Sequence, residues 1–318
     1  MKKVNPKYLS LGTLLDADID SPAAIAAGIV KPYASFTGTV ARALRPFPQY
    51  QDISTANLFG SDKSGNSTYH ALQVKLQGHV ANGLNLQLAY AFSKNLTDNS
   101  NNRDLDTNAA NYYAAQNGYD PQAEKTYASM DIPHNLTIGY VYELPIGRGK
   151  PFLSNGWESK VIGGWSFSGV LTYQSGLMIS TPFPASSHVP LFAGSIRPNR
   201  IEGTPALSDA VRSGTFNPNR DAYLNAAAWA SPAPFSFGDA GGMSGVRVPT
   251  MLNEDLSLSK IIPIAERLHA EFRADAFNVF NRTVFGFPNL DLSSPGFGTI
   301  ASQRNNPRTL QVGLKLNF

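Results

Sequence analysis

The sequence contains no cysteine, no long apolar run and little net charge, and each absence excludes a class of protein. Without cysteine the chain can form neither a disulfide framework nor a thiolate metal site, and it has no cysteine nucleophile. It lacks any run of about 18 apolar residues, which excludes a transmembrane helix, although strands can cross a membrane without such a run. The formal net charge of +3 includes no block of Lys or Arg, so we expect no nucleic-acid partner.

Two short stretches resemble ligand-binding loops, but neither keeps the residues that such a loop needs. The stretch 147–150, Gly-Arg-Gly-Lys, is followed by Pro151 where a phosphate-binding loop has Ser or Thr. The stretch 104–108 begins like a calcium loop, yet Ala109 and Ala115 replace the required glycine and glutamate. The five histidines are not spaced as metal ligands, and no nucleophile-elbow motif is present. We therefore expect no cofactor, no metal site and no enzymatic activity.

The overall composition is that of a folded protein, with 42% hydrophobic and 15% charged residues. A length of 318 residues allows one large or two ordinary domains. The first residues, MKKVNPKYLSLGTLLDADID, imitate a signal peptide poorly, because Pro6 and Lys7 interrupt the approach to the apolar part and acidic residues follow it. We expect no cleavable signal sequence here.

The last nine residues, LQVGLKLNF, alternate strictly between apolar and polar positions. One parity contains Leu310, Val312, Leu314, Leu316 and Phe318. The other parity is polar or small. A period of two residues is typical of a β-strand with one apolar and one polar face.

The same alternation recurs along the chain and predicts about seven strands. Two of them, near 72–76 and 84–92, flank Ala81-Asn82-Gly83, a sequence that favours a hairpin turn. The others lie near 136–144, 165–173, 256–258, 268–276 and 310–318. The links between them alternate in length: those around 93–133, 174–250 and 281–308 are long, and those between are shorter. This sorting is typical of outer-membrane barrels, with long extracellular loops and shorter periplasmic turns.

The polar parity of these strands contains the residues that would face the lumen of such a barrel. In the strand 268–276 four titratable side chains share this face, so a slip of one residue in register would turn all of them toward lipid. The lumen-facing candidates are Lys75, Gln87, His269, Glu271, Arg273, Asp275, Gln311 and Lys315. The same pattern also fits the solvated face of a soluble antiparallel sheet. Aromatic residues near the strand ends on the apolar parity favour the membrane interpretation.

The stretch AEFRADAFNVFNRTVFGFPNLDLSSPGFGTIASQRNNPRTLQVGLKLNF, 270–318, resembles the C-terminal end of TonB-dependent outer-membrane receptors, specifically the Oar-like group. Further fragments resemble the same family in the same order: 5–9, 69–77, 91–94, 132–135 and 256–260. The resemblance implies a 22-stranded barrel around a plug domain, driven by the inner-membrane TonB complex. It also implies that Phe318 belongs to the signal by which the barrel-assembly machinery recognises the last strand.

The chain departs from this family pattern, because we find no plug domain, no TonB box and far too few strands for 22. We therefore predict an all-β fold, a partial antiparallel transmembrane β-barrel of about 7–8 strands from the C-terminal part of a receptor in the cell outer membrane. Residues 1–67 are expected to be a loop-like, irregular segment from the barrel interior of the parent sequence, and 68–318 the C-terminal barrel portion. Its partners would be outer-membrane lipid, the assembly machinery and an unidentified large solute, with the TonB complex acting only through a plug.

Two alternatives stay open at the level of sequence. One is a passive porin-like barrel, which would need an even and sufficient number of strands. The other is a soluble or secreted β-sandwich that binds carbohydrate or mediates adhesion. Because about seven strands leave two unpaired edges, and unpaired backbone groups are costly in lipid, we also expect that this chain alone does not insert as a stable closed barrel.

Overall fold

The computed structural model describes residues 4–50, 65–98, 116–117, 119–120, 122–184, 196–265 and 268–318. The stretch 104–108, which begins like a calcium loop, and one of the five histidines, His188, lie outside these residues.

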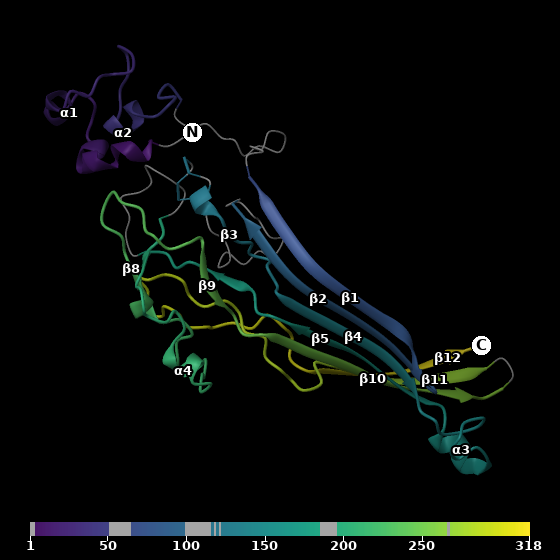
Figure 1. Cartoon of the computed structure of the whole chain (residues 1–318). Coiled ribbons are helices and arrows are strands. Elements are labelled where there is room, and N and C mark those ends of the chain that lie inside the picture. The colour runs from purple at the N-terminus through teal and green to yellow at the C-terminus, as the bar shows by residue number, and fades with distance from the viewer. Residues whose placement is uncertain are drawn as a thin grey trace.

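One large antiparallel sheet dominates the structure (Figure 1). Its strand order is β1-β2-β4-β5-β10-β11-β12, with β3 paired to the end of β2. The strands are β1 Ser67–Ala81, β2 Leu84–Thr97, β3 Thr126–Tyr127, β4 His134–Glu143, β5 Trp165–Gln174, β10 Met251–Pro263, β11 His269–Phe277 and β12 Thr309–Asn317. The predicted fold class is confirmed, and the barrel is not closed: within the described residues β1 and β12 each pair with a strand on one side only.

Long and short links lie at opposite ends of this sheet, as the sequence predicted. The turn between β1 and β2 is tight because Gly83 adopts a φ of +85°, where a Cβ would lie 2.6 Å from the carbonyl oxygen of Glu143. The link between β4 and β5 contains the short helix α3, Gly156–Ile162, at this same end. The long links gather at the opposite end, where Figure 1 shows α4, β8 and β9.

The register places apolar side chains in continuous rows on one face of the sheet. One row crosses six strands, from Leu84 and Tyr142 through Phe167, Leu258 and Ala274 to Val312. These side chains do not form a core: Val312 is 70% exposed and Leu76 is 59% exposed. In the described part of the chain, no second sheet covers this face. The apolar side chains of this face are therefore exposed and can contact an apolar environment such as lipid.

The main hydrophobic core lies in the long links instead. It is formed by the β5–β10 link and the segment between β11 and β12, and its fully buried members include Ile179, Leu224 and Ala228. The elements of the first link are β6 Met178–Ser180, β7 Asn199–Arg200, α4 Asp209–Arg212, η4 Ala226–Ala228, β8 Trp229–Ala230 and β9 Met243–Arg247. Strand β6 pairs with β9, and β7 pairs with β8. We call this cluster the loop core.

The described part of 1–67 consists of loops and short helical stretches. The helical stretches are η1 Pro6–Asp16, α1 Pro22–Ala26 and α2 Val40–Ala43. The side chains of Ser21 and Thr39 accept hydrogen bonds from backbone N–H groups in the first turns of α1 and α2, which satisfies donors that have no partner within a helix. Leu15, Phe36 and Val40 form a small core that includes Ile196 of the β5–β10 link.

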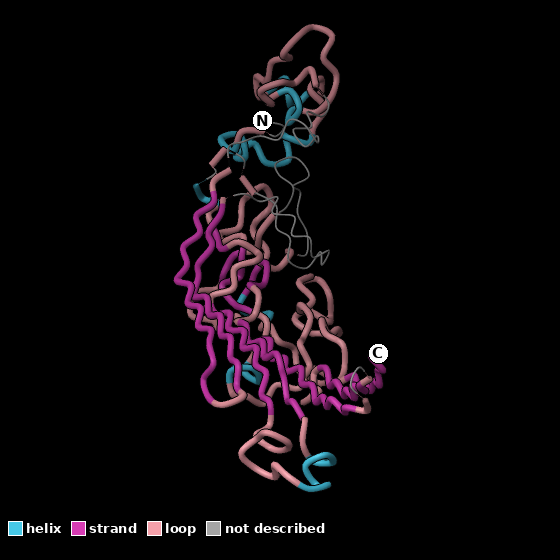
Figure 2. Tube along the Cα trace, turned by 90° about the vertical axis from the view of Figure 1, so that its right-hand side faces the viewer, coloured by secondary structure: helices cyan, strands magenta, loops and turns pink. Residues whose placement is uncertain are grey.

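The N-terminal helices and the C-terminal strand lie far apart in the molecule. Figure 2 shows the strands as a curved layer, with the N-terminal segment beyond one end and the C-terminus near the other end of the strands. None of the helices in the described ranges has the length and apolar composition needed to span a membrane.

Candidate functional site

The polar parity of the sheet lines a hollow of about 730 Å³. Residues from β1, β2, β4, β5, β10 and β11 contribute to it, so the hollow follows the width of the sheet. Its polar side chains are Gln77, His79, Asn85, Gln87, Thr137, Ser168, Asp255, Ser257, Arg273 and Asp275. Tyr140 and Phe277 add aromatic surface. The hollow can therefore donate and accept hydrogen bonds to a polar solute and contact its apolar parts.

Three of the lumen-facing candidates line this hollow, namely Gln87, Arg273 and Asp275. The other five lie elsewhere on strands of the sheet. Lys75 is opposite Ala89, and His269 is opposite Asn317, beyond the lining. The remaining candidates lie in two cross-strand pairs of β11 and β12. Glu271 is opposite Lys315, and Gln311 is opposite Asp275, which also lines the hollow. Phe318, the proposed assembly signal, follows β12 and is fully exposed.

Among the described residues, the charge pair on β11 is internal to the strand. The Nε atom of Arg273 donates to Oδ1 of Asp275 at 2.8 Å and to Oδ2 at 3.0 Å. The carboxylate is the more buried partner, with 14% of its side chain exposed against 57% for the guanidinium. Because Arg273 neutralises this carboxylate and keeps N–H groups free, the pair can still donate hydrogen bonds to a solute in the hollow.

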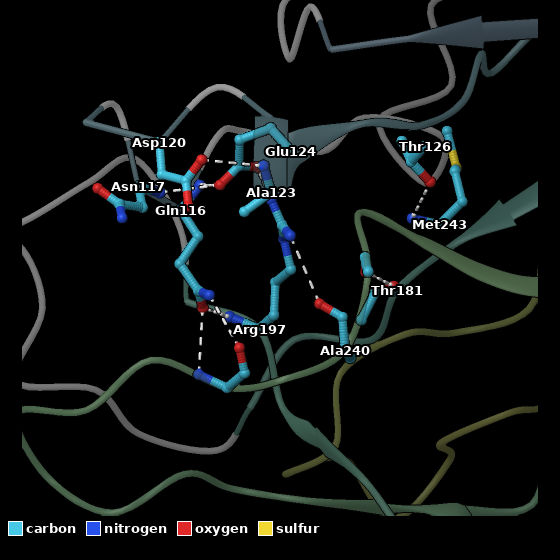
Figure 3. A network of polar contacts seen from close by, with 12 residues as sticks. Gln116, Asn117, Asp120, Ala123, Glu124, Thr126, Thr181, Arg197, Ala240 and Met243 are labelled. Atoms are coloured by element: carbon cyan, nitrogen blue, oxygen red, sulfur yellow. Dashed lines mark hydrogen bonds and ion pairs between the residues drawn. The ribbon is translucent and has the colours of Figure 1, made fainter.

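A buried polar network joins the β2–β4 link to the β5–β10 link (Figure 3). Glu124, at the end of the short helix η3, Gln122–Glu124, forms an ion pair with Arg197. The side chains of both are almost fully buried, at 3% and 7% exposed. Oε1 of Glu124 also accepts from the backbone N–H groups of Gln116 and Asn117, at 3.2 Å and 2.9 Å. The buried carboxylate of Glu124 is thus neutralised by Arg197 and hydrogen-bonded within the network.

The side-chain amide of Gln116 extends this network to Gly238, a second point of the β5–β10 link. Its oxygen accepts from the backbone N–H groups of Arg197, at 2.9 Å, and Gly238, at 3.3 Å. Its nitrogen donates to the carbonyl of Gly238 at 2.9 Å. A Cβ at Gly238 would lie 2.0 Å from the carbonyl oxygen of Arg197, so only glycine fits here. No periodic pattern in the sequence predicts this arrangement, because its parts are up to 122 positions apart.

A second ion pair fixes the point where β9 passes the end of β2. Asp131, whose carboxylate is completely buried, pairs with Arg247 of β9. Its Oδ1 accepts from the backbone N–H of Asn95 at 2.6 Å, and Arg247 donates to the carbonyl of Gly176 at 3.0 Å. The hydroxyl of Tyr223 donates to the carbonyl of Arg247 at 2.7 Å, and burial raises the pKa of Tyr223 to about 12. The long links are thus held to the sheet by neutralised, hydrogen-bonded groups.

A third ion pair lies on the apolar parity of β10. Glu254 is opposite Leu171 and is buried, and both of its carboxylate oxygens accept from Nε of Arg282, at 3.1 Å and 2.9 Å. The hydrogen bond from Arg282 to Glu254 raises the pKa of the guanidinium. This pair neutralises an acid that would otherwise face the apolar side near the long-link end of the sheet.

Metal coordination has no candidate in the described ranges, where no three His, Asp or Glu side chains gather closely enough to hold an ion.

Residues 11–311 match the family described as the outer membrane beta barrel domain. The chain belongs to this family of outer-membrane barrels. A comparison with curated proteins found no match. Membership agrees with the open antiparallel sheet and its exposed apolar face, and it places the barrel domain in the outer membrane.

Two solved structures are similar to this barrel domain at 11% sequence identity. One is FpvA of P. aeruginosa, solved in a complex with a heterologous pyoverdine and iron, where the match covers 79% of this chain and 19% of that chain with a TM-score of 0.34. The other is the outer membrane transporter YddB from Escherichia coli, with 80% and 25% covered and a TM-score of 0.38. The chain thus spans between a fifth and a quarter of the length of these proteins.

Proposed function

We propose that this chain forms part of the wall of a TonB-dependent, Oar-like outer-membrane transporter that moves a large solute across the outer membrane. The observation that carries the proposal is the division of the sheet into two faces. One face is apolar in continuous rows and stays exposed, while the other carries the polar side chains that line the hollow. A wall between lipid and a wet lumen needs this division.

The open edges support a wall that is completed by further strands. Six successive antiparallel pairings lead from β1 to β12, so these two edge strands run in the same direction. Direct pairing of β1 with β12 would therefore be parallel. An antiparallel barrel requires an odd number of additional strands between them, which gives an even total.

The proposed roles follow from this placement. The chain supplies the C-terminal portion of the barrel, the TonB complex acts through a plug domain rather than through these strands, and β12 with Phe318 is recognised by the barrel-assembly machinery. The hollow faces the plug or the passing solute, and no chemical step is assigned to any residue. The long links, which have their own core, form the outer surface that a solute meets first.

Refolding of the purified chain in detergent micelles and in plain buffer tests this proposal. We expect β structure only in micelles, measured by far-UV circular dichroism, and we expect it to be protected from protease there. A protease-resistant monomer in buffer would mean that the apolar rows pack on one another, and a soluble sandwich would replace the proposal.

Two substitutions on neighbouring residues of β12 sharpen this experiment. Val312→Arg places a cation on the apolar face and Gln311→Arg places it on the polar face, and both positions are exposed to water in the chain itself. In a membrane wall an arginine on the lipid side costs roughly 2–4 kcal/mol at mid-bilayer depth. We expect Val312→Arg to unfold at lower urea concentration in micelles and Gln311→Arg to match the parent; equal midpoints contradict a lipid-facing β12.

A further inference from the structure

Basic residues gather on the apolar parity at the long-link end of β1, β2 and β4. His70 of β1 is directly opposite Lys94 of β2, and His134 of β4 is directly opposite Phe92, two residues before Lys94 on the same face. Directly opposite side chains are about 5 Å apart and diagonal ones about 7–8 Å. The three basic groups therefore form one cluster, which we call the basic cluster.

Aromatic side chains orient the basic cluster. The hydroxyl of Tyr90 is 2.8 Å from Nδ1 of His134, and the ring of Phe92 lies 5.1 Å from the imidazole, centroid to centroid. Because Nδ1 is engaged by Tyr90, Nε2 is the ring nitrogen of His134 that is left to contact an outside group. The Nζ atom of Lys94 lies 5.4 Å from the centroid of the Tyr127 ring.

The acids near this cluster are engaged elsewhere. The carboxylate of Asp131 is buried and paired with Arg247. Asp98, which shares the parity of Lys94 four positions further on, accepts hydrogen bonds from the backbone and side chain of Asn66, and these hydrogen bonds lower its pKa. In the described residues Lys94 has no carboxylate within ion-pair distance. Lys94 thus gives the cluster an exposed positive charge that no carboxylate of the described residues pairs with.

We propose that the basic cluster binds the phosphate of a lipid headgroup in the leaflet on the long-link side. The inference rests on the proposed function, because this face meets lipid only if the sheet is a membrane wall. From the cluster toward the short-turn end of the strands, the same face is formed by Tyr90, Leu88 and Leu86. Acyl chains would therefore lie along the strands while the phosphate reaches Lys94 and His134. Aromatic side chains at such a boundary and basic groups that bind headgroups are typical of membrane interfaces.

The test uses the whole chain folded in neutral detergent micelles, with lipid retention measured by native mass spectrometry. Phosphatidic acid is the phosphate-bearing probe, and phosphatidylcholine with the same acyl chains is the comparison. We expect preferential retention of phosphatidic acid and, for the variant Lys94→Gln/His134→Gln, retention at least fivefold weaker, since one lysine near an anionic surface contributes about fivefold and His134 adds a hydrogen-bonding group.

The control variant Lys75→Gln/His269→Gln removes the same residue types from the opposite face, outside the hollow lining. It should retain phosphatidic acid like the parent. If the double variant at the cluster does not fold, Lys94→Gln alone replaces it and should weaken retention about fivefold. Retention that is unchanged at the cluster, or equal for both lipids, overturns the proposal.

Two further readouts separate the possible failures. Inorganic phosphate that displaces the lipid and is itself retained would identify a free-phosphate site and overturn the lipid assignment. Circular dichroism and proteolysis of the same samples report whether the chain folds in micelles. Micelle-dependent folding without preference for phosphatidic acid overturns only the headgroup site, whereas folding that needs no micelle overturns the proposed function as well.

Discussion

Breaking the buried ion pair between Glu124 and Arg197 should release the long links from one another without affecting the sheet. The substitution Glu124→Gln is nearly isosteric, and the glutamine Oε1 can still accept from the N–H groups of Gln116 and Asn117. The charge and the acceptor at Oε2 are lost, because the amide nitrogen that replaces Oε2 cannot accept from Arg197, so the buried guanidinium faces a neutral donor in place of the carboxylate.

The magnitude follows from the burial of the pair. Both side chains are less than a tenth exposed, and removing one partner of such a pair costs roughly 3–5 kcal/mol. The exposed pair Asp209–Arg212, with side chains 97% and 52% exposed, is the matched control. Asp209→Asn should cost about 0.5 kcal/mol or less.

Amide hydrogen exchange of the chain in micelles measures this difference locally. The backbone N–H groups of Gln116, Asn117 and Gly238 donate into the network and report its opening. At about 1.4 kcal/mol per factor of ten, we expect their protection to fall roughly 100- to 1000-fold in Glu124→Gln. The double variant Glu124→Gln/Arg197→Met should recover part of it, because no charge remains buried. Equal protection in Glu124→Gln and Asp209→Asn would refute the reasoning.

Three further predictions concern the links and their attachment. Gly176→Ala should lower the free energy of unfolding by roughly 3 kcal/mol, because its Cβ would lie 1.6 Å from the carbonyl oxygen of Val248, whereas Gly313→Ala, with no atom within 4 Å, should match the parent. Leu224→Ala should destabilise the loop core by roughly 2–5 kcal/mol, seen as faster proteolysis of the links with unchanged circular dichroism of the sheet in micelles; cleavage at the parent rate would contradict a packed core. Stability should fall between pH 10 and 12 by roughly 2–3 kcal/mol, because unfolded Tyr223 loses its proton near 10 and the folded protein keeps it to about 12; a Tyr223→Phe variant with the same fall would assign it to other groups.

The strands could be predicted from the sequence because their signal is local. In β12 each residue reports its own face, and the alternation from Leu310 to Leu316 needs no knowledge of the neighbouring strand. The turn at Asn82-Gly83 is also local, since glycine tolerates the positive φ that closes the hairpin. For the same reason the polar parity of Gln87, Arg273 and Asp275 could be read before their common hollow was known.

The contents of the long links could not be read in this way. Tyr223 and Leu224 receive their hydrogen-bond and packing partners from Gly298, more than 70 positions later, where a Cβ would lie 2.7 Å from the carbonyl oxygen of Leu224. No periodic pattern in either segment predicts this contact. The helical stretches of the N-terminal segment also have no periodic signal, because they are short and are stabilised by caps and by a small shared core.

By itself the sequence determined the strands, their two faces and the sorting of short and long links, because a period of two and a turn motif are properties of neighbouring residues. Only the tertiary structure decided that the long links share a core, that Glu124 meets Arg197, and that His70, Lys94 and His134 lie together. Those contacts depend on the register of strands and on segments up to 122 positions apart, whose meeting is set by packing and charge neutralisation rather than by any local pattern.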